Sequence, residues 1–396
     1  MRTSADPEVN EDATMEDGPG TRRAQSCAVG ERAAAHEFHA AVAQEHMALV
    51  IFFCSAGYDL AVLAHEMQRL FTGVQVIGCT TAGEFGPAGC SERSIVGASF
   101  ASSSFTAVSG RIDRLTSFEF SRAQSVAQDL MQQLERLDQR ADATNSFALL
   151  LIDGLSVREE PVTRALQGAL EGLPLVGGSA GDGLDFGTTY VYADGSFRSD
   201  VAVLVLVTTQ LPFGIFKTQH FVPTDERVVV TAADAMHRIV REFDGRPAAQ
   251  DYARLTGSSI DDLDTMHFAR QPMVVLIDGT TYVRSIQSAN PDGSLTLFCA
   301  IEEGVVLRVA RGEDLLGNLD GALATIHSAI GTPQLVIAFD CILRKLEVVE
   351  NGVLGRVEEM YRRNNVVGFN GYGEQFRGVH VNQTLTGIAF GDPARE

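Results

Sequence analysis

The chain has 396 residues, 45% hydrophobic and 21% charged, the composition of a globular protein that is large enough for two hydrophobic cores. Its net charge is −20, because 51 acidic residues outnumber 31 basic ones. A surface this acidic repels phosphate backbones and anionic lipid headgroups, which argues against nucleic acids and membranes as partners.

The first segment of the chain is polar and acidic. Asp6 to Gly20 contains no apolar run, so it does not resemble a signal peptide, and we predict that residues 1–28 form a disordered acidic tail. Apolar runs further along, such as Val201 to Val207, are far shorter than the ~18–20 residues of a membrane-spanning helix. The six cysteines form no Cys-x-x-Cys pair, as expected of reduced thiols. We therefore expect a cytoplasmic protein.

One succession of elements occurs three times along the chain. Each copy reads as a strand, a helix, a second strand and a glycine-rich turn that ends in an acidic residue. The three copies span residues 48–84, 147–182 and 335–374. Such units form parallel strand pairs with right-handed crossovers, so we expect the turns at the carboxyl ends of strands, where ligands bind in sheets of this kind.

The glycine-rich turns are therefore predicted to form a ligand edge. Glycine lets the backbone approach a ligand closely, and an acid there can bind a cationic group or orient a histidine. Alternatively, these are three ordinary tight turns whose acids accept hydrogen bonds from their own backbone. The residues assigned to the ligand edge are Gly78, Gly83, Glu84, Gly177, Gly178, Asp182, Gly373 and Glu374.

The second half of the chain adds a segment of antiparallel character. Between residues 273 and 309, short apolar runs are separated by the turn pairs Asp278-Gly279 and Asp292-Gly293. We predict an α/β to α+β fold with two domains of mixed sheets and helices, residues 29–211 and residues 212–396.

The turns and the end of the chain also resemble a known family. Val76–Glu84 resembles the IGCSTAGE signature of the FIST N-terminal domain, and Val176–Asp182 resembles its second signature. Phe339–Arg344 resembles the FxCxxR stretch of the FIST C-terminal domain. Tyr372–Glu374 and His380–Thr384 resemble that domain's closing YGE…HNxT pattern.

Within this family, Thr218–Thr224 together with the closing motifs is most similar to the nitric-oxide-sensing haemoprotein branch (NosP). This resemblance implies a cytosolic sensory protein that binds haem and responds to nitric oxide. It also implies control of a partner histidine kinase, in a two-component system, or of a cyclic-di-GMP enzyme. A homodimer is compatible with it.

Haem iron needs an axial ligand such as His, Cys or Tyr in an apolar pocket. His220 lies in the apolar run between Phe216 and Val222 and is our first choice for the metal ligand. His380, close in sequence to the last turn, is the second choice; its alternative role is to tie that turn to Asn382 by hydrogen bonds. No Cys-x-x-Cys-His motif occurs, so the expected cofactor is non-covalent haem b.

Three further residues are candidates for contacts with a cofactor. Cys341 is a candidate thiolate ligand, although its apolar run favours a structural thiol. Tyr372 is a candidate ligand or pocket hydroxyl. Arg344, with Lys345 beside it, suits an anionic group such as a haem propionate or an amino-acid carboxylate; alternatively it caps a solvated strand end.

Two other functions are kept as alternatives. One is a haem-free FIST sensor of a small metabolite such as an amino acid. The other, more remote, is a serine hydrolase, because Gly177–Gly181 fits the G-x-S-x-G pattern. That pattern requires a helix directly after the serine, whereas Asp182–Gly187 is typical of a loop. We therefore expect a ligand-binding sensor without catalytic residues rather than an enzyme.

Overall fold

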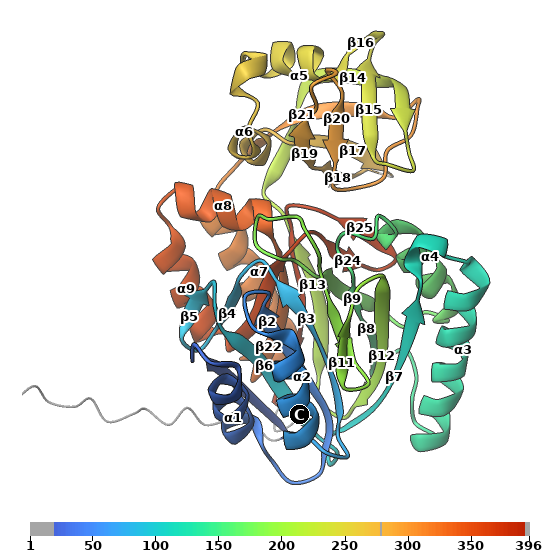
Figure 1. Cartoon of the computed structure of the whole chain (residues 1–396), viewed down its shortest axis with the longest axis vertical. Coiled ribbons are helices and arrows are strands. Elements are labelled where there is room, and N and C mark those ends of the chain that lie inside the picture. The colour runs from blue at the N-terminus through green and yellow to red at the C-terminus, as the bar shows by residue number, and fades with distance from the viewer. Residues whose placement is uncertain (1–19, 278, 393–396) are drawn as a thin grey trace, which may run out of the picture.

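Three six-stranded sheets form the body of the protein, and a fourth, eight-stranded sheet forms a smaller lobe at one end (Figure 1). The computed structural model describes residues 20–277 and 279–392. Each sheet of the body mixes parallel and antiparallel strands, and helices cover the outer faces. The predicted α/β to α+β architecture is therefore confirmed.

The body consists of three repeats with one element order: strand, helix, strand, helix, strand, hairpin, strand. Repeat 1 comprises β1 (Thr21–Ser26), α1 (Glu31–Val42), β2 (Met47–Ser55), α2 (Leu60–Leu70), β3 (Gln75–Thr81), β4 (Glu84–Gly86), β5 (Gly89–Ser91) and β6 (Ile95–Ala101). Repeat 2 comprises β7 (Phe105–Asp113), α3 (Phe120–Leu137), β8 (Ser146–Ile152), α4 (Glu159–Ala169), β9 (Leu175–Ser179), β10 (Val191–Ala193), β11 (Ser196–Arg198) and β12 (Val201–Thr209). Repeat 3 comprises β13 (Phe213–Thr218), α7 (Leu315–Ile330), β22 (Leu335–Cys341), α8 (Ile342–Glu350), α9 (Leu354–Arg363), β23 (Val366–Gly371), β24 (Glu374–Phe376), β25 (Val379–Val381) and β26 (Leu385–Phe390).

Repeat 3 is interrupted between β13 and α7 by the inserted lobe, residues 221–312. Its strands pair antiparallel, as predicted for residues 273–309, around a core of their own. The body therefore contains residues from both predicted domains, and the separate unit is the lobe. Its elements are β14 (Phe221–Asp234), β15 (Ile239–Phe243), β16 (Arg246–Pro247), α5 (Ala248–Thr256), α6 (Thr265–Arg270), β17 (Met273–Ile277), β18 (Thr280–Arg284), β19 (Ile286–Ala289), β20 (Leu295–Leu297) and β21 (Val306–Gly312).

The N-terminal strand differs from the sequence expectation. Residues 1–19 of the predicted tail lie outside the described residues, whereas Thr21–Ser26 forms β1, the antiparallel neighbour of β6. Its sequence, TRRAQS, has a single apolar residue, Ala24. Pairing with β6, and not an apolar pattern, makes this segment a strand, so no local signal in the sequence predicts it.

Each repeat lends its hairpin to the sheet of another repeat. The hairpin β4–β5 pairs with β23 of repeat 3, β10–β11 pairs with β3 of repeat 1, and β24–β25 pairs with β9 of repeat 2. All three sheets consequently have the same strand order, and each contains strands of two repeats. The three repeats are interlocked in a closed cycle.

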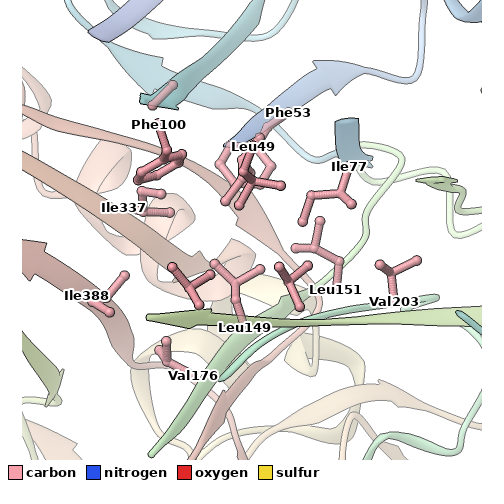
Figure 2. Packing of buried hydrophobic residues seen from close by; sticks show 14 of the residues in the cluster. Leu49, Phe53, Ile77, Phe100, Leu149, Leu151, Val176, Val203, Ile337 and Ile388 are labelled. Carbon is pink, nitrogen blue, oxygen red and sulfur yellow. The ribbon is translucent and has the colours of Figure 1, made fainter. Parts of the chain in front are cut away.

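The centre of the body is an apolar core where the inner faces of the three sheets meet (Figure 2). Strand β8 shows how the sequence builds it. Leu149 and Leu151 point into this core, while Leu150 and Ile152 pack under α3 and α4. A strand buried on both faces has no polar positions, which explains the continuous apolar run of β8.

Gly373 lies in the last glycine-rich turn, where the packing leaves no room for a side chain. Its φ is +153°, and a Cβ at this position would lie 2.3 Å from Cε1 of His380. We expect Gly373→Ala to lower the free energy of unfolding by about 2–5 kcal/mol, measured by urea titration. Gly321→Ala is the control, because a Cβ in this part of α7 meets no atom within 4 Å, and alanine should stabilise the helix by about 1 kcal/mol. Equal effects of the two substitutions would contradict this account.

Candidate functional site

The three glycine-rich turns meet at one place in the body. They are joined by a cycle of backbone hydrogen bonds, each running from one repeat to the next. The bonds run from Ala82 N–H to Asn370 O (2.8 Å), from Tyr372 N–H to Ser179 O (3.3 Å) and from Gly181 N–H to Thr80 O (3.0 Å). These pairs also establish which positions of the repeats are equivalent: Thr80, Ser179 and Asn370 each accept one bond of the cycle.

Two of the three acids, Glu84 and Glu374, accept hydrogen bonds from residues of their own repeats. The Glu84 carboxylate accepts hydrogen bonds from the Thr81 hydroxyl and from both N–H (3.0 Å) and hydroxyl (2.9 Å) of Ser94. Glu374 accepts from N–H and hydroxyl of Thr384 in the same way. Both carboxyls are buried. This arrangement matches the alternative in which the acids hold the turns in place.

Asp182, the third acid, is not equivalent to the other two. Repeat 2 carries a longer turn, residues 182–189, and Val191 of β10 stands where β4 has its glutamate. The Asp182 carboxylate accepts from N–H of Gly187 (2.7 Å) and from the Tyr372 hydroxyl. The sequence pattern did not reveal that Asp182 differs, because the longer turn of repeat 2 places an unrelated acid directly after the glycine-rich motif.

The buried Glu84 carboxyl makes stability depend on pH. Burial raises its pKa from the ordinary 4.5 to about 7, although the hydrogen bonds from Thr81 and Ser94 favour the charged form. Because the folded-state pKa is the higher one, its stabilising contribution is complete below pH 4.5 and is lost as the pH rises through 7.

We expect Glu84→Gln to remove this dependence, since the amide stays neutral at every pH. Relative to the variant, the wild type should lose about 3 kcal/mol of unfolding free energy between pH 4.5 and 8. Urea titrations of both proteins across this range measure the difference. A constant difference between the two curves would show that Glu84 does not titrate there.

The two candidate haem ligands are enclosed by protein. His220 is 4% exposed, and its Nε2 lies 2.8 Å from Oε1 of Glu347. His380 is 2% exposed, with Nδ1 3.3 Å from Nε2 of Gln375 and Nε2 3.4 Å from the Phe298 carbonyl. In this geometry both imidazoles are buried and lie within hydrogen-bond distance of protein groups, contacts that haem binding would have to displace.

Ser179 does not have the surroundings of a nucleophile. Its hydroxyl is buried and accepts a hydrogen bond from the side-chain amide of Gln375 at 2.9 Å. That amide stands between the serine and His380. No helix follows the serine within residues 180–190. A base in contact with the hydroxyl, which a serine hydrolase requires, is therefore lacking in this arrangement.

The remaining cofactor candidates are buried among protein groups. Cys341 is buried at the start of α8, and burial raises the pKa of its thiol well above the ordinary value. Burial also raises the pKa of Tyr372, whose ring packs 4.8 Å from that of Phe186. Arg344 is 2% exposed and forms an ion pair with Asp340 at 2.9 Å, so its charge already has a partner within the protein.

A cavity of about 290 Å³ does lie beside this ion pair, on the helix-covered face of the repeat 3 sheet. We call it the repeat 3 cavity. It is closed on one side by the hairpin lent by repeat 1 and on the other by α8 and α9. The lining residues are Phe85, Cys90, Ser91, Glu92, Asp340, Lys345, Val348, Val349, Leu354, Val357, Tyr361 and Asn370.

The other repeats show why space remains at this position in repeat 3. In the hairpins, Cys90 faces Phe85 across the strand pair, as Phe197 faces Tyr192 in the hairpin lent to repeat 1. Phe197 packs with Tyr192 at 5.1 Å between ring centroids and helps fill the equivalent space. The small thiol of Cys90 leaves that volume open in repeat 3.

The polar end of the cavity also breaks the repeat pattern. Asp340 of β22 is equivalent to Cys54 in repeat 1 and to Ile152 in repeat 2, both buried against helices. The Asp340 carboxylate is held by Arg344 and by the Tyr361 hydroxyl at 3.2 Å. A buried charge where sister repeats have apolar side chains is stabilising only if paired, and Arg344 and Tyr361 supply that pairing.

Lys345 supplies the opposite charge at the mouth of the cavity. Its ammonium donates to the Ala82 carbonyl at 3.0 Å and pairs with Glu92 at 3.2 Å. The Glu92 side chain is 86% exposed. Sequence reasoning named Lys345 but missed Asp340, Cys90 and Glu92; the only available signal was a charge at the end of an otherwise apolar strand.

The described residues, 20–277 and 279–392, also bear on metal binding and on membrane-spanning helices. Among those residues, no group of three or more His, Cys, Asp and Glu side chains is placed to hold a metal ion. Within the same residues, every helix is too short or too polar to cross a membrane.

Comparisons with known proteins agree with the motifs. The FIST N domain model matches residues 48–246, and the FIST C domain model matches residues 248–377. Among solved structures, a cyanuric acid hydrolase from A. caulinodans is similar over 94% of this chain and 99% of its own, with 8% identity and a TM-score of 0.38. A second cyanuric acid hydrolase structure covers the same shares with 10% identity and a TM-score of 0.38. A search of curated proteins gave no match.

Proposed function

Because this chain belongs to the FIST family, whose domains are generally sensory, we propose that it senses a small zwitterionic metabolite, an α-amino acid with an apolar side chain. The ligand binds in the repeat 3 cavity. The observation that carries this proposal is the pairing of both signs of charge at one end of that cavity with an apolar wall at the other.

The polar end suits the two charges of an amino acid. The Lys345 ammonium is placed to take a carboxylate and the Glu92 carboxylate is placed to take an ammonium. Asp340, also in the lining, is paired with Arg344. In the structure Lys345 and Glu92 pair with each other. A zwitterion replaces this single pair by two, so neither charge loses its partner when the ligand enters.

The apolar end suits a compact hydrocarbon side chain. Val348, Val349, Leu354 and Val357 come from α8 and α9, and Phe85 closes the opposite side. The volume, about 290 Å³, lies at the lower end of the range of small-molecule sites, roughly 300–1,000 Å³. Leucine, methionine and phenylalanine are the expected ligands among the common amino acids.

Calorimetric titration with each L-amino acid tests the proposal. Lys345→Met should weaken binding by about 10- to 100-fold, because it removes a charged hydrogen bond to the carboxylate. Cys90→Phe should abolish binding by filling the cavity as Phe197 does elsewhere. Arg363→Met is the matched control, since it removes an exposed cation from α9. Absence of binding by every amino acid, or equal binding by wild type and Cys90→Phe, would refute the proposal.

Haem-dependent sensing of nitric oxide, which the family resemblance implies, is the competing hypothesis and has a separate test. Since His220 and His380 are enclosed, we expect protein reconstituted with haem to show no stoichiometric Soret band. A strong band that shifts with nitric oxide and is lost in His220→Ala or His380→Ala would reverse this expectation. A histidine kinase or a cyclic-di-GMP enzyme as partner, a homodimer and a cytoplasmic location likewise stay predictions.

A further inference from the structure

Helix α8 lies beside the inserted lobe (Figure 1), and it also lines the repeat 3 cavity. Lys345, Val348 and Val349 on one side of the helix line the cavity. Ile342 and Leu343 are buried in a cluster with lobe residues from α6 and from the segment after β20. The helix has only nine residues. A displacement on its cavity side therefore reaches its lobe side, because close-packed interiors transmit strain.

The lobe is joined to the body by two connections that lie together. One runs from β13 to β14 through His220, and the other runs from β21 to α7 through Gly312 and Glu313. The Glu313 N–H donates to the His220 carbonyl at 2.9 Å. A Cβ added at Gly312 would lie 3.4 Å from Nε2 of His220. The His220 ring thus occupies the junction of both connections.

His220 also binds α8 directly. Its Nε2 lies 2.8 Å from Oε1 of Glu347, with the two side chains 1% and 10% exposed. Among the described residues, the second carboxylate oxygen of Glu347 is buried and has no hydrogen-bond partner. The His220 ring also packs against Phe221, with 4.3 Å between ring centroids. This buried polar contact therefore links the cavity helix to the base of the lobe.

A second anchor holds the lobe on the side away from α8. Arg238 of the lobe is buried and pairs with Glu159 at 2.6 Å and with Glu160 of α4 at 2.5 Å. Breaking a buried pair by removing one partner costs about 3–5 kcal/mol, so this side is suited to act as a fixed support. The α8 side is held by His220–Glu347, by the exposed Arg270–Glu350 pair, by apolar contacts and by hydrogen bonds of Gln383 with Ala269 and Ser285. It has no ion pair as deeply buried as that of Arg238 among the described residues, so we take it as the side that moves.

We propose that the His220–Glu347 contact is the coupling element of the sensor: occupation of the repeat 3 cavity displaces α8, and this contact passes the displacement to the inserted lobe, which pivots at Arg238. The inference rests on the proposed function for the identity of the ligand but not for its test, because Cys90→Phe fills the cavity without any ligand. The lobe is then the output surface that a partner reads.

Hydrogen–deuterium exchange of the full chain tests the coupling. Wild type and Cys90→Phe are compared, and the comparison is repeated in a His220→Leu/Glu347→Leu background. Replacing both partners by apolar side chains leaves no unpaired buried charge, so the background should fold. We expect Cys90→Phe to change exchange in 219–224 and 265–270 by about fivefold or more, the size of a typical coupling. In the double-leucine background this change should disappear.

The controls separate coupling from general loosening. Arg270→Met removes the exposed pair with Glu350 and should leave the response to Cys90→Phe intact. If the double-leucine protein does not fold, the single variant Glu347→Gln gives the same comparison with a weakened contact. An equal response in both backgrounds, or a response limited to α8, α9 and the hairpin, would overturn the proposal.

Failure of the two proposals can be distinguished. If no amino acid binds but the exchange response depends on His220 and Glu347, the ligand assignment fails and the coupling stands. If an amino acid binds with the predicted loss in Lys345→Met but the lobe never responds, the ligand assignment stands and the coupling fails. In a coupled protein, the double-leucine variant should also change the affinity for the best-binding amino acid by about fivefold or more.

Discussion

The exchange of hairpins between repeats is the constraint on which the rest of the structure depends. Each hairpin leaves its own repeat and completes another sheet, and the cycle of backbone hydrogen bonds at the turns fixes the direction of the exchange. Backbone bonds need no particular side chains, so side chains near the turns are free to differ. Gly83 and Gly373 are needed because the chain must pass through positive φ where it crosses to the neighbouring sheet.

Threefold repetition gives the protein its own internal comparison. Where the repeats agree, as in the apolar strand faces, side chains serve packing. Where one repeat departs, the departure needs a reason, and the departures of repeat 3 gather at one place: Asp340 replaces an apolar residue, Cys90 leaves a volume that Phe197 fills elsewhere, and α8 and α9 replace a single helix. Their coincidence at one cavity is what singles out that cavity.

The sequence reveals the parts of this fold that are encoded locally. The apolar runs of β2 and β8, the helices after them and the glycine-rich turns are readable because each depends on near neighbours. The exchange of hairpins is not readable, since short strands such as Glu84–Gly86 carry no mark of a partner that lies near residue 368. The apolar run around His220 predicts a ligand position, whereas the contact that its imidazole makes is with Glu347, 127 residues away. The cavity depends on the small size of the Cys90 side chain, and no sequence motif marks a small side chain as the wall of a cavity.

The hairpin exchange also orders events during synthesis. The hairpin that closes the repeat 3 cavity ends at Ser91, whereas α8 begins only at Ile342. While the ribosome makes everything between them, including the whole inserted lobe, β4 and β5 have no sheet to join. The repeat 3 cavity is thus among the last features to form, because a chain that ends before α8 has no such cavity. Until β23 is made, the edge of β4 that pairs with it stays open, and an open strand edge favours association with other chains.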